Sequence, residues 1–567
     1  MQQHDLSKMF LHLKSYVTRI VGSQNILIKS NCRKLYQPHI SLSIILPFLQ
    51  NSSLLCFNKI MVSRVASATP YGFVGQIIEV EGDMSKGLPS LQIVGMGNKA
   101  IDESRDRVRS AIKNSSLDFP KGKLVINLAP AELPKDGSQF DLPIALAILC
   151  VGDILTQSDL DNAIFAGELA LDGTLRPIKS AIVTAEVAKA KKIKSVYVPS
   201  KNAEQAALVS GVNIFPVNDL KSLFLHLKKE KTIKRINKAS LKLPSSLTKN
   251  NLTIDNIYGQ EQAKRAIQIA VAGRHNILLS GPPGSGKTML AKALKNLLPP
   301  LSKSEIIEVT KLHSLGEHTI ISKSITERPF REPHHTASRA SIIGGGSKIQ
   351  PGEISLAHRG VLFLDEFLEY PRTVLESLRQ PLEDHEITVS RVNGKFTFPA
   401  NFILVATMNP CPCGFLGDPE KTCTCSQNQI LNYQKKLSGP LLDRIDLTVS
   451  VSRVSHEKLI DSSPSTKLQQ GIFLSEILRA HSIQKDRYKC SYKYNNDITG
   501  SSVDKLTSIS TPAKSFSIEA SKKLGLSARS YFKVIKVART IADLDGSPSI
   551  EIPHIAESLQ YRQINIT

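Results

Sequence analysis

The sequence predicts a multidomain α/β protein with a helical C-terminal domain. Its 567 residues suggest about three or four domains, at roughly 100–200 residues each. Short apolar runs alternate with amphipathic segments from about residue 62 to about residue 454, and a mostly helical pattern follows. Hydrophobic residues make up 41% of the chain and charged residues 22%, which excludes a disordered or collagenous protein.

Residues 1–60 differ from the rest of the chain. They hold seven Lys or Arg and a single acid, Asp5, without a clean apolar period. One interpretation is a targeting segment. We favour an extension or misassigned start upstream of Met61, because a strongly patterned segment begins directly after that methionine. The most apolar stretch, Leu42–Leu49, is far shorter than the roughly 18–20 residues that span a membrane, so no membrane association is expected.

The first α/β domain is expected over residues 61–220, followed by a basic linker over 221–249. The linker holds nine Lys or Arg against the single acid Glu230. In the first expected helix, acids near the start and basic residues near the end suit the helix dipole. The expected strands and helices are Val74–Val80, Leu124–Leu128 and Ser195–Val198, and Ala100–Lys113 and Ala181–Lys191.

The chain is strongly basic, with 72 Lys and Arg against 50 Asp and Glu and a net charge of +22. Such a balance favours a polyanionic partner, with nucleic acid as the first candidate. A genome of biased base composition would supply the same lysine-rich composition without selection for binding. Charge alone therefore leaves both interpretations open.

The strongest motif is a phosphate-binding loop in a second α/β domain, expected over residues 250–454. The loop fits G-x-x-x-x-G-K-[ST] between an expected strand, His275–Ser280, and an expected helix, Met289–Leu298. Its glycines let backbone N–H groups surround phosphates. Lys287 would reach the β- and γ-phosphates of ATP, and the Thr288 hydroxyl would ligate Mg²⁺. We assign nucleotide binding to Gly281, Pro282, Pro283, Gly284, Ser285, Gly286, Lys287, Thr288 and Met289.

Two further expected strands end in residues suited to ATP hydrolysis. The run Val361–Leu364 predicts a buried parallel strand. Asp365 then follows, placed to hold the Mg²⁺ shell, and Glu366 is placed to act as general base on the attacking water. Asn409 ends another apolar run and could bind the γ-phosphate or the water; the alternative is a turn-forming asparagine. These strand tips would meet at one sheet edge.

The order of these motifs resembles that of AAA+ ATPases, and more narrowly that of the magnesium-chelatase-like proteins of the YifB/ComM family. The resemblance covers about residues 62–565. It rests also on the stretches Ser63-Arg64-Val65, Gly87-Leu-Pro89, Ile93-Val-Gly95, Glu103-Ser-Arg105, Gly259-Gln260, Arg331-Glu-Pro-His334-His335-Thr336, Ser438-Gly-Pro-Leu-Leu-Asp-Arg444-Ile-Asp446 and Leu526-Ser-Ala-Arg529.

The resemblance implies roles for individual residues. Glu366 matches the family's catalytic acid and Asn409 its sensor-1 residue. Arg444 matches an arginine finger, which neutralises charge on a neighbouring subunit's γ-phosphoryl group; the alternative is a salt bridge to an adjacent aspartate, Asp443 or Asp446. In the expected helical lid domain, 455–567, the residue that matches sensor 2 and would touch the γ-phosphate is Arg529. The residues where the family cradles adenine are Ile257 and Tyr258.

A finger acting in trans requires a homo-oligomer, and the resemblance implies a hexamer. Two insertions would project from such a ring, one at Phe330–Gly360 and one at a hairpin around Glu386–Phe398, with a turn signal at Asn393-Gly394. In related ATPases such insertions line the pore and touch the substrate. The candidate phosphate contacts are Arg331, Arg339, Lys348, Arg391 and Lys395, while His334 and His335 have either a functional or a packing role.

Parts of the first domain, such as Asn127–Pro130 and Gly167–Pro177, resemble the proteolytic domain of Lon-type proteases. This implies a Lon-protease/ribosomal-S5-like fold. Those enzymes use a Ser nucleophile activated by Lys. Here Gln139 and Ile182 hold the two places, and neither can do that chemistry. We therefore expect a scaffold or a binding domain and no active protease; the alternative is a shifted pair, Ser138 and Lys179.

Four of the eight cysteines form the pattern C-x-C-x₉-C-x-C, namely Cys411, Cys413, Cys423 and Cys425. Four thiolates can close tetrahedrally on a structural Zn²⁺, and the alternative is a cysteine-rich loop without metal. The other cysteines are scattered, which is typical of a reducing, cytoplasmic protein rather than a disulfide scaffold.

The leading functional hypothesis is a cytoplasmic ring ATPase that uses ATP and Mg²⁺ to move DNA. For YifB/ComM-like proteins the resemblance implies a helicase acting in branch migration on branched or single-stranded DNA during recombination and natural transformation. The alternatives are a magnesium-chelatase-like ATPase and a regulatory ATPase that remodels a protein partner. ATP-dependent proteolysis is opposed by Gln139 and Ile182.

Overall fold

The computed structural model describes residues 62–562, apart from 96–97, 134, 136, 237–251, 317–323, 347–348, 392–393, 419, 455–468, 491–492 and 500–501. The N-terminal extension, Lys348 and the Asn393 turn position therefore lie outside the described residues. Two large sheets, each with helices packed around it, confirm the predicted α/β class. Among the described helices, none carries an apolar stretch long enough to cross a bilayer.

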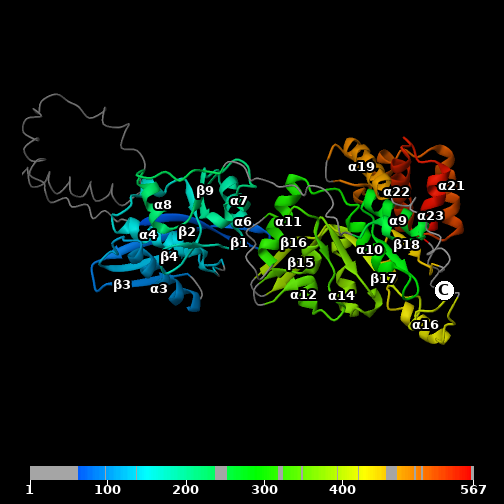
Figure 1. Cartoon of the computed structure of the whole chain (residues 1–567), viewed down its shortest axis with the longest axis horizontal. Coiled ribbons are helices and arrows are strands. Elements are labelled where there is room, and N and C mark those ends of the chain that lie inside the picture. Colours follow the sequence, from blue (N-terminus) through cyan, green and yellow to red (C-terminus); the bar gives the residue numbers. More distant parts are fainter. Residues whose placement is uncertain are drawn as a thin grey trace, which may run out of the picture. The chain divides into compact units, whose positions relative to one another are not determined.

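The first domain is built on a mixed sheet of seven strands (Figure 1). Its centre is antiparallel, because β2 pairs with both β1 and β4, and the remaining pairings are parallel. In spatial order the strands are β3 (Ser90–Val94), β4 (Lys123–Ala129), β2 (Val74–Ser85), β1 (Ser63–Tyr71), β5 (Ala163–Phe165), β8 (Ser195–Pro199) and β9 (Asn213–Val217).

Helices of two kinds pack on this sheet. The helix α4 (Asp141–Val151) is almost wholly apolar and all of its residues are buried, so it forms the centre of the core. The other helices are amphipathic or short: α3 (Asn98–Asn114), α6 (Ala181–Ala190), α7 (Ser200–Ala206) and α8 (Leu220–Leu227). Because α8 buries Leu220, Leu223 and Leu227 in the same core, the range expected as a linker begins with a packed helix of the first domain.

The second domain contains a sheet of five parallel strands. The three inner strands are nearly or wholly apolar, as parallel strands covered on both faces require, whereas the two outer strands carry polar residues. In spatial order they are β11 (Phe330–Arg331), β14 (Val361–Leu364), β17 (Ile403–Met408), β10 (Ile277–Ser280) and β18 (Leu447–Ser450). The strand before the phosphate loop, β10, thus lies between the strand that ends at Asn409 and the strand that follows Arg444.

The expected hairpin is present, formed by β15 (Glu386–Arg391) and β16 (Gly394–Pro399) in antiparallel register. Its buried residues Ile387, Val389, Phe396 and Phe398 alternate with exposed ones, so one face packs on the domain core. The exposed face carries Lys395.

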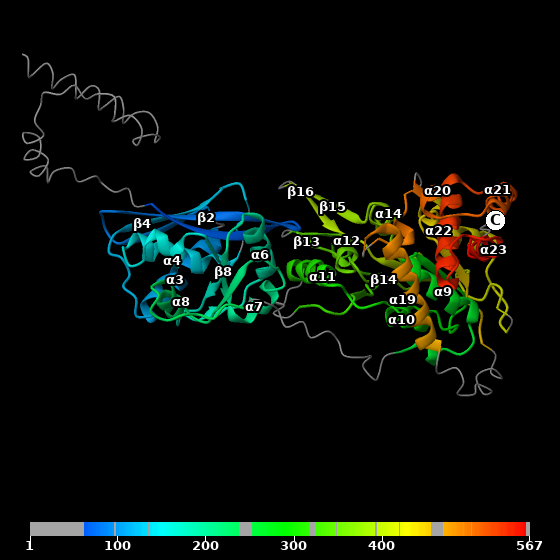
Figure 2. The ribbon, with the colours of Figure 1, turned by 90° about the horizontal axis from the view of Figure 1, so that it is seen from above.

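The C-terminal helices surround α22 (Ala528–Asp545), whose inner face is buried. The long α19 (Gln469–Tyr488) packs against both α22 and α9 (Glu261–Gly273) of the second domain, and Figures 1 and 2 show these three helices grouped together. The shorter α21 (Thr511–Lys523) and α23 (Ile552–Gln560) complete the group.

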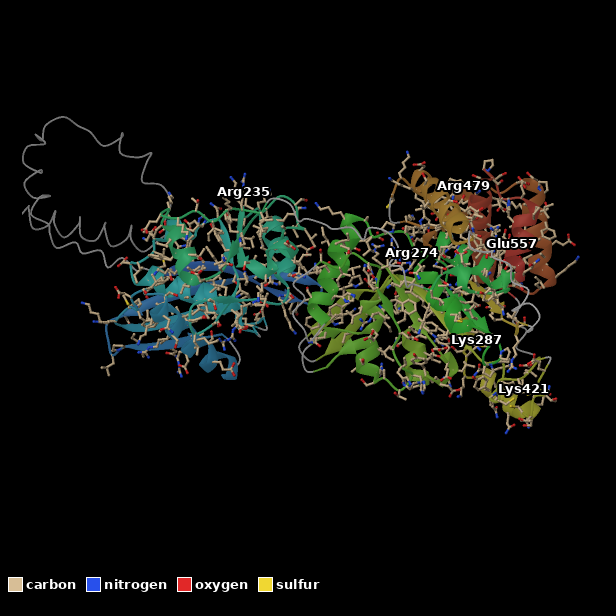
Figure 3. The ribbon with its side chains drawn as sticks, in the orientation of Figure 1. Arg235, Arg274, Lys287, Lys421, Arg479 and Glu557 are labelled. Carbon is tan, nitrogen blue, oxygen red and sulfur yellow. The ribbon has the colours of Figure 1, made fainter. Side chains whose placement is uncertain are left out.

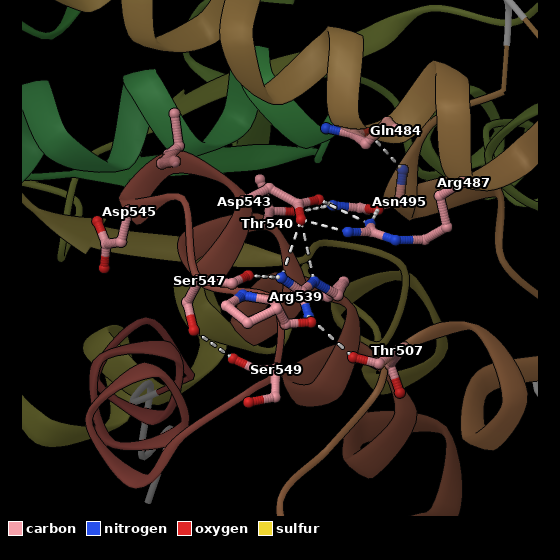
Figure 4. A network of polar contacts seen from close by, with 12 residues as sticks. Gln484, Arg487, Asn495, Thr507, Arg539, Thr540, Asp543, Asp545, Ser547 and Ser549 are labelled. Carbon is pink, nitrogen blue, oxygen red and sulfur yellow. Dashed lines mark hydrogen bonds and ion pairs between the residues drawn. The ribbon is translucent and has the colours of Figure 1, made fainter.

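A buried ionic network joins these helices (Figure 4). The Asp543 carboxylate, fully buried, accepts hydrogen bonds from Arg487, from Asn495 at 2.9 Å and from Arg539 Nε at 3.1 Å. Arg539 is also fully buried and donates to the backbone carbonyls of Thr507, Ser547 and Pro548. Every charge in the network thus has a partner, which a buried ion pair needs in order to be tolerated.

We predict that Asp543→Ala lowers the free energy of opening of α22 by about 3–5 kcal/mol, because two arginines lose the carboxylate that compensates their charge. Hydrogen exchange of the α22 amides, followed by mass spectrometry, measures this local free energy. The matched control is Glu519→Ala, which removes a fully exposed carboxylate paired with Lys523 and should leave exchange unchanged. Unchanged protection in Asp543→Ala would show that the network contributes nothing to stability.

Candidate nucleotide site and its surroundings

The phosphate loop connects β10 to α10 (Lys287–Lys295), so the helix begins at the motif lysine, two residues earlier than the sequence suggested. Gly284 and Gly286 have φ values of +80° and +88°, a conformation that favours glycine. At Gly281 a Cβ atom would lie 2.1 Å from the carbonyl oxygen of Val451. The glycines are therefore required by backbone shape and by close packing of the loop on the strand end.

Lys287 folds back over the loop (labelled in Figure 3). Its Nζ donates to the carbonyl oxygens of Gly281 at 2.6 Å and Pro282 at 2.9 Å, and to Asn409 Oδ1 at 3.3 Å. Burial lowers the pKa of the ammonium group, while Asp365 and Glu366 oppose that shift. Neutral oxygen atoms thus hold the ammonium group of the lysine beside the loop. From this position the side chain can turn toward a bound phosphate.

The end of β14 meets the end of β17 beside this lysine. Thr288 Oγ donates to Asp365 Oδ2 at 3.2 Å, and Thr407, from β17, donates to the other carboxylate oxygen. A hydroxyl and a carboxylate at this distance are the hard oxygen donors that Mg²⁺ prefers. The residues present therefore fit a magnesium ion bound with a nucleotide.

Glu366 follows in the left-handed region, with φ of +51°. Its backbone N–H donates to Thr407 Oγ at 3.2 Å, which fixes the turn. The side chain is 57% exposed, and one carboxylate oxygen lies 3.7 Å from His335 Nδ1. The carboxylate is accordingly free to meet a water molecule, with one imidazole as its neighbour.

A cavity of about 450 Å³ opens beside the phosphate loop. Tyr258 and Met289 line it with half-exposed apolar surface, which suits a planar base. The complete lining is Asn256, Ile257, Tyr258, Gln260, Pro283, Gly284, Ser285, Gly286, Met289, Glu420, Arg453 and Val454. The structure thus brings together Ile257, Tyr258 and the loop residues that the sequence assigned to nucleotide binding.

The four motif cysteines gather in the loop that follows Asn409. Their sulfur atoms all lie within 4.8 Å of one another, with Cys411 3.4 Å from Cys413 and 3.6 Å from Cys423. Backbone N–H groups of Phe415 and Thr424 lower the pKa of Cys413 to about 6, which favours the thiolate. No disulfide joins them. The set can therefore supply four sulfur ligands to a tetrahedral metal.

Arg444 and Arg529 converge on a carboxylate that the sequence did not single out. Arg444 Nη2 is bonded to one oxygen of Glu383 and Arg529 Nη2 to the other. Arg444 also donates to the carbonyl oxygens of Arg379 and Pro440. The expected alternative, a bridge from Arg444 to an adjacent aspartate, is absent from these contacts.

This arginine pair lies at the edge of the sheet opposite to the phosphate loop. Asn276 directly precedes β10, and its side-chain amide donates to the carbonyl oxygen of Arg444 at 3.2 Å. Gly281 directly follows β10 and starts the loop. The four residues of β10 lie between Asn276 and Gly281, and they extend over roughly 13 Å. Arg529, which the sequence placed near the γ-phosphate, lies with Arg444 and not with Lys287.

Near the arginine pair, Asp446 is wholly buried. Burial alone would raise its pKa, but Lys533 at 2.6 Å and His275 at 3.8 Å hold it below the ordinary value. Asp446 Oδ2 also accepts from the backbone N–H of Asn276 at 2.9 Å. The aspartate therefore anchors the start of β10 and β18 rather than pairing with Arg444.

The candidate DNA contacts differ in their surroundings. Arg331 makes a bidentate pair with Glu353, at 2.6 and 2.8 Å. Arg339 and Arg372 are exposed and line one cavity of about 510 Å³. Lys395 is exposed on β16, whereas the side chain of Arg391, like Lys348, lies outside the described residues.

In the first domain, the two positions that matter for proteolysis are occupied by buried side chains. Gln139 donates to the carbonyl oxygen of Ala68 at 3.3 Å, and Ile182 is fully buried in the hydrophobic core. Ser138, the alternative nucleophile, donates its hydroxyl proton to the Glu168 carboxylate. Ser138 thus has a carboxylate as its hydrogen-bond partner, whereas the alternative pair would give it Lys179.

Among the residues that the geometry brings to these sites and the sequence did not indicate, four make specific contacts. Thr407 gave a signal, because it is a polar residue inside an otherwise apolar buried strand. Arg453, Glu420 and Glu383 gave none, because they reach their sites through contacts between distant segments.

Comparison with known proteins agrees with this arrangement. The family model "Magnesium chelatase, subunit ChlI" matches residues 253–459, "Subunit ChlI of Mg-chelatase" matches 80–202, and "Magnesium chelatase, subunit ChlI C-terminal" matches 473–562. Competence protein ComM of Haemophilus influenzae is 40% identical over 88% of this chain and 97% of its own length. The uncharacterized protein YifB of Escherichia coli is 39% identical over 89% of this chain and 97% of its own length.

A shorter match falls on the Archaeal Lon protease of Methanothermobacter thermautotrophicus, which is 50% identical over 54 residues, 10% of this chain and 8% of that protein. This agrees with a Lon-like fold for part of the chain and carries no activity. Since the ComM and YifB matches extend over nearly the whole of both proteins, the chain belongs to the magnesium-chelatase-like AAA+ ATPases of the ComM/YifB family.

Proposed function

We propose that this protein is an ATP-hydrolysing ring motor that acts on DNA in the cytoplasm, as a branch-migration helicase. The observation that carries the ATPase part is the meeting of Lys287, Asp365 and Asn409 at one edge of a parallel sheet. The DNA part is supported by the basic charge of the chain and by its similarity to a protein named for competence.

In this proposal each residue at the sheet edge has one task. Lys287 exchanges its carbonyl partners for the β- and γ-phosphate oxygens. Thr288 and Asp365 hold Mg²⁺, which when bound neutralises charge on the phosphates. Glu366 takes a proton from the attacking water, and Asn409 orients that water or the γ-phosphate. Tyr258 and Ile257 receive the adenine in the neighbouring cavity.

We expect Glu366→Gln to bind ATP normally and to hydrolyse it about 10²–10⁴-fold more slowly, because a carboxamide is a poor base. Lys287→Ala should lose ATP binding itself. Fluorescent-nucleotide titration and phosphate release measure the two steps separately. Glu369→Gln is the matched control, since it removes an exposed carboxylate three residues away that pairs with Lys436. Wild-type turnover by Glu366→Gln would remove that residue from its role.

The arginine pair supports a head-to-tail homo-oligomer, which we propose is a hexamer. Within one chain Arg444 and Arg529 lie at the sheet edge opposite to the phosphate loop. They can therefore reach a γ-phosphate only when it belongs to a neighbouring subunit. In this proposal the neighbour's phosphate replaces the Glu383 carboxylate, which holds both guanidinium groups in the free subunit.

Mixing variants tests this arrangement. Arg444→Ala alone should lose about 10³–10⁵ in hydrolysis rate with ATP binding retained. Mixed with Glu366→Gln, it should regain activity, because some interfaces then pair an intact Glu366 with an intact Arg444. Arg444→Ala mixed with Arg529→Ala should stay inactive, because both changes spoil the same face. Recovery in that second mixture, or full activity of Arg444→Ala alone, contradicts the assignment.

The proposed DNA contacts are the two exposed arginines that share a cavity, Arg339 and Arg372. Each phosphate contact releases condensed counterions, so DNA affinity should fall steeply with salt. We predict that Arg339→Ala and Arg372→Ala each weaken binding to branched and single-stranded DNA, and each reduce the slope of log affinity against log salt by about one. Lys523→Ala, on the lid, is the control and should leave the slope unchanged.

A second candidate function is that of a magnesium-chelatase-like or regulatory ATPase that remodels a protein partner. The observation that favours it is the match of both the ATPase and the C-terminal segments to magnesium-chelatase models. The two candidates differ in what stimulates hydrolysis. Stimulation by DNA supports the motor, whereas hydrolysis that is indifferent to DNA at low salt supports the alternative.

We also propose that the four motif cysteines hold a structural Zn²⁺. Zinc–sulfur bonds of about 2.3 Å in a tetrahedron place sulfur atoms about 3.8 Å apart. The sulfur–sulfur separations of 3.4 and 3.6 Å in the structure come close to that value. With four sulfur ligands the metal has no open position, so its contribution is to the shape of the loop.

A further inference from the structure

The cysteine loop, defined here as residues 411–425, packs directly on the phosphate loop. A Cβ atom at Gly414 would lie 2.7 Å from Pro283 Cδ, so the backbone of the cysteine loop packs closely against the ring of this proline. The cysteine loop also begins two residues after Asn409, whose side chain meets Lys287. The cysteine loop therefore contacts the nucleotide site directly, so a change in the shape of this loop would displace residues of that site.

Arg453 links the two loops by side-chain contacts. Its Nε lies 3.0 Å from Asp418 and its Nη1 lies 3.0 Å from Glu420, both in the cysteine loop. Its guanidinium lies over the ring of Phe415, with 5.7 Å from Cζ to the ring centroid, and Nη2 donates to the Pro283 carbonyl at 3.4 Å. Three residues of the cysteine loop thus contact this arginine.

The same arginine forms part of the nucleotide cavity. Arg453 and Glu420 both line it, next to Pro283 and Gly284. A guanidinium in this position can donate to the oxygens of a ribose or an α-phosphate. Asp418, whose side chain is fully buried, keeps the guanidinium at the wall of the cavity.

We propose that metal binding by the four cysteines and nucleotide binding in the adjacent cavity are coupled, and that Arg453 is the nucleotide-binding residue through which they are coupled. The proposal rests on the nucleotide site and the zinc site proposed above. A metal that joins Cys411 and Cys413 to Cys423 and Cys425 closes the segment that carries Phe415, Asp418 and Glu420. Without the metal that segment gains conformational freedom, and Arg453 loses its fixed partners.

Coupling of this kind is reciprocal. If the metal raises nucleotide affinity by some factor, the nucleotide raises metal affinity by the same factor. Typical coupling between two sites amounts to about 5–150-fold. Because the two sites here share one wall, we expect about a tenfold effect in each direction.

The experiment uses the full chain, a fluorescent ATP analogue and Zn²⁺, with Mg²⁺ in excess throughout. The protein should contain one zinc per chain by elemental analysis. A zinc-selective chelator should weaken analogue binding about tenfold, and added Zn²⁺ should restore it. Arg453→Met should weaken binding by a similar factor, and the chelator should then add less than about twofold, because effects that act through one residue are not additive.

Two controls isolate the effect. Lys421→Met removes another cation from the cysteine loop, one that lies over the same Phe415 ring but does not line the cavity. Cys490→Ser removes a cysteine outside the motif. Both should keep wild-type analogue affinity and the wild-type response to the chelator.

The outcomes separate this proposal from the proposed function. A protein without zinc, an affinity indifferent to the chelator, or an equal chelator effect in Arg453→Met overturns the coupling. If the chelator unfolds the domain, the reverse measurement decides: saturating analogue must raise the zinc affinity, measured by competition with the chelator, about tenfold in the wild type and not in Arg453→Met. Metal-dependent binding without hydrolysis supports the coupling while rejecting the motor, and a zinc-loaded protein that binds no nucleotide rejects both.

Discussion

The parallel pairing of β17 with β10 on one side and with β14 on the other is the constraint on which the rest of the site depends. Register places Ser280 opposite Met408 and Leu364 opposite Ala406, so the three strands end close to one level. Asp365, Asn409 and the phosphate loop therefore emerge together, although Thr288 and Asp365 are 77 residues apart and Lys287 and Asn409 are 122 residues apart. At the opposite ends of these strands, the buried carboxylate of Asp446 accepts a hydrogen bond from the backbone N–H of Asn276. The side chain of Asn276 in turn accepts one from the backbone N–H of Leu404, and these two bonds keep the strand ends aligned.

Much of this arrangement could be predicted from the sequence, because the motifs are local. The phosphate loop, the strand before Asp365 and the hairpin each have a pattern within a few residues, and each was found close to its expected place. The contacts of Arg529 and Arg453 could not be predicted in this way. The bond from Arg529 to Glu383 spans 146 residues, and no local pattern encodes which distant carboxylate a guanidinium will meet.

The first domain shows a different limit of prediction. All residues of its helix α8 after Leu220 lie in a range whose lysines indicated a linker, because charge counting ignored the leucines at every third or fourth position. The expectation that Gln139 and Ile182 lack nucleophile and base chemistry, by contrast, depends only on residue type and not on contacts between distant segments. Their burial adds that this part of the domain is used for packing.

The phosphate loop follows the end of β10, whereas the arginine pair lies near its start. The second domain therefore presents two different ends to its surroundings. In the proposed oligomer, a head-to-tail row of subunits that does not close into a ring has two incomplete ends. At one end a phosphate loop has no arginine pair beside it, and at the other an arginine pair has no phosphate. Closure removes both incomplete ends at once, and an angle between neighbours that misses closure produces an open helix instead. In the proposed oligomer the short strand β10 thus gives the assembly a polarity, so that two-fold, face-to-face pairing of two subunits would complete no site at all.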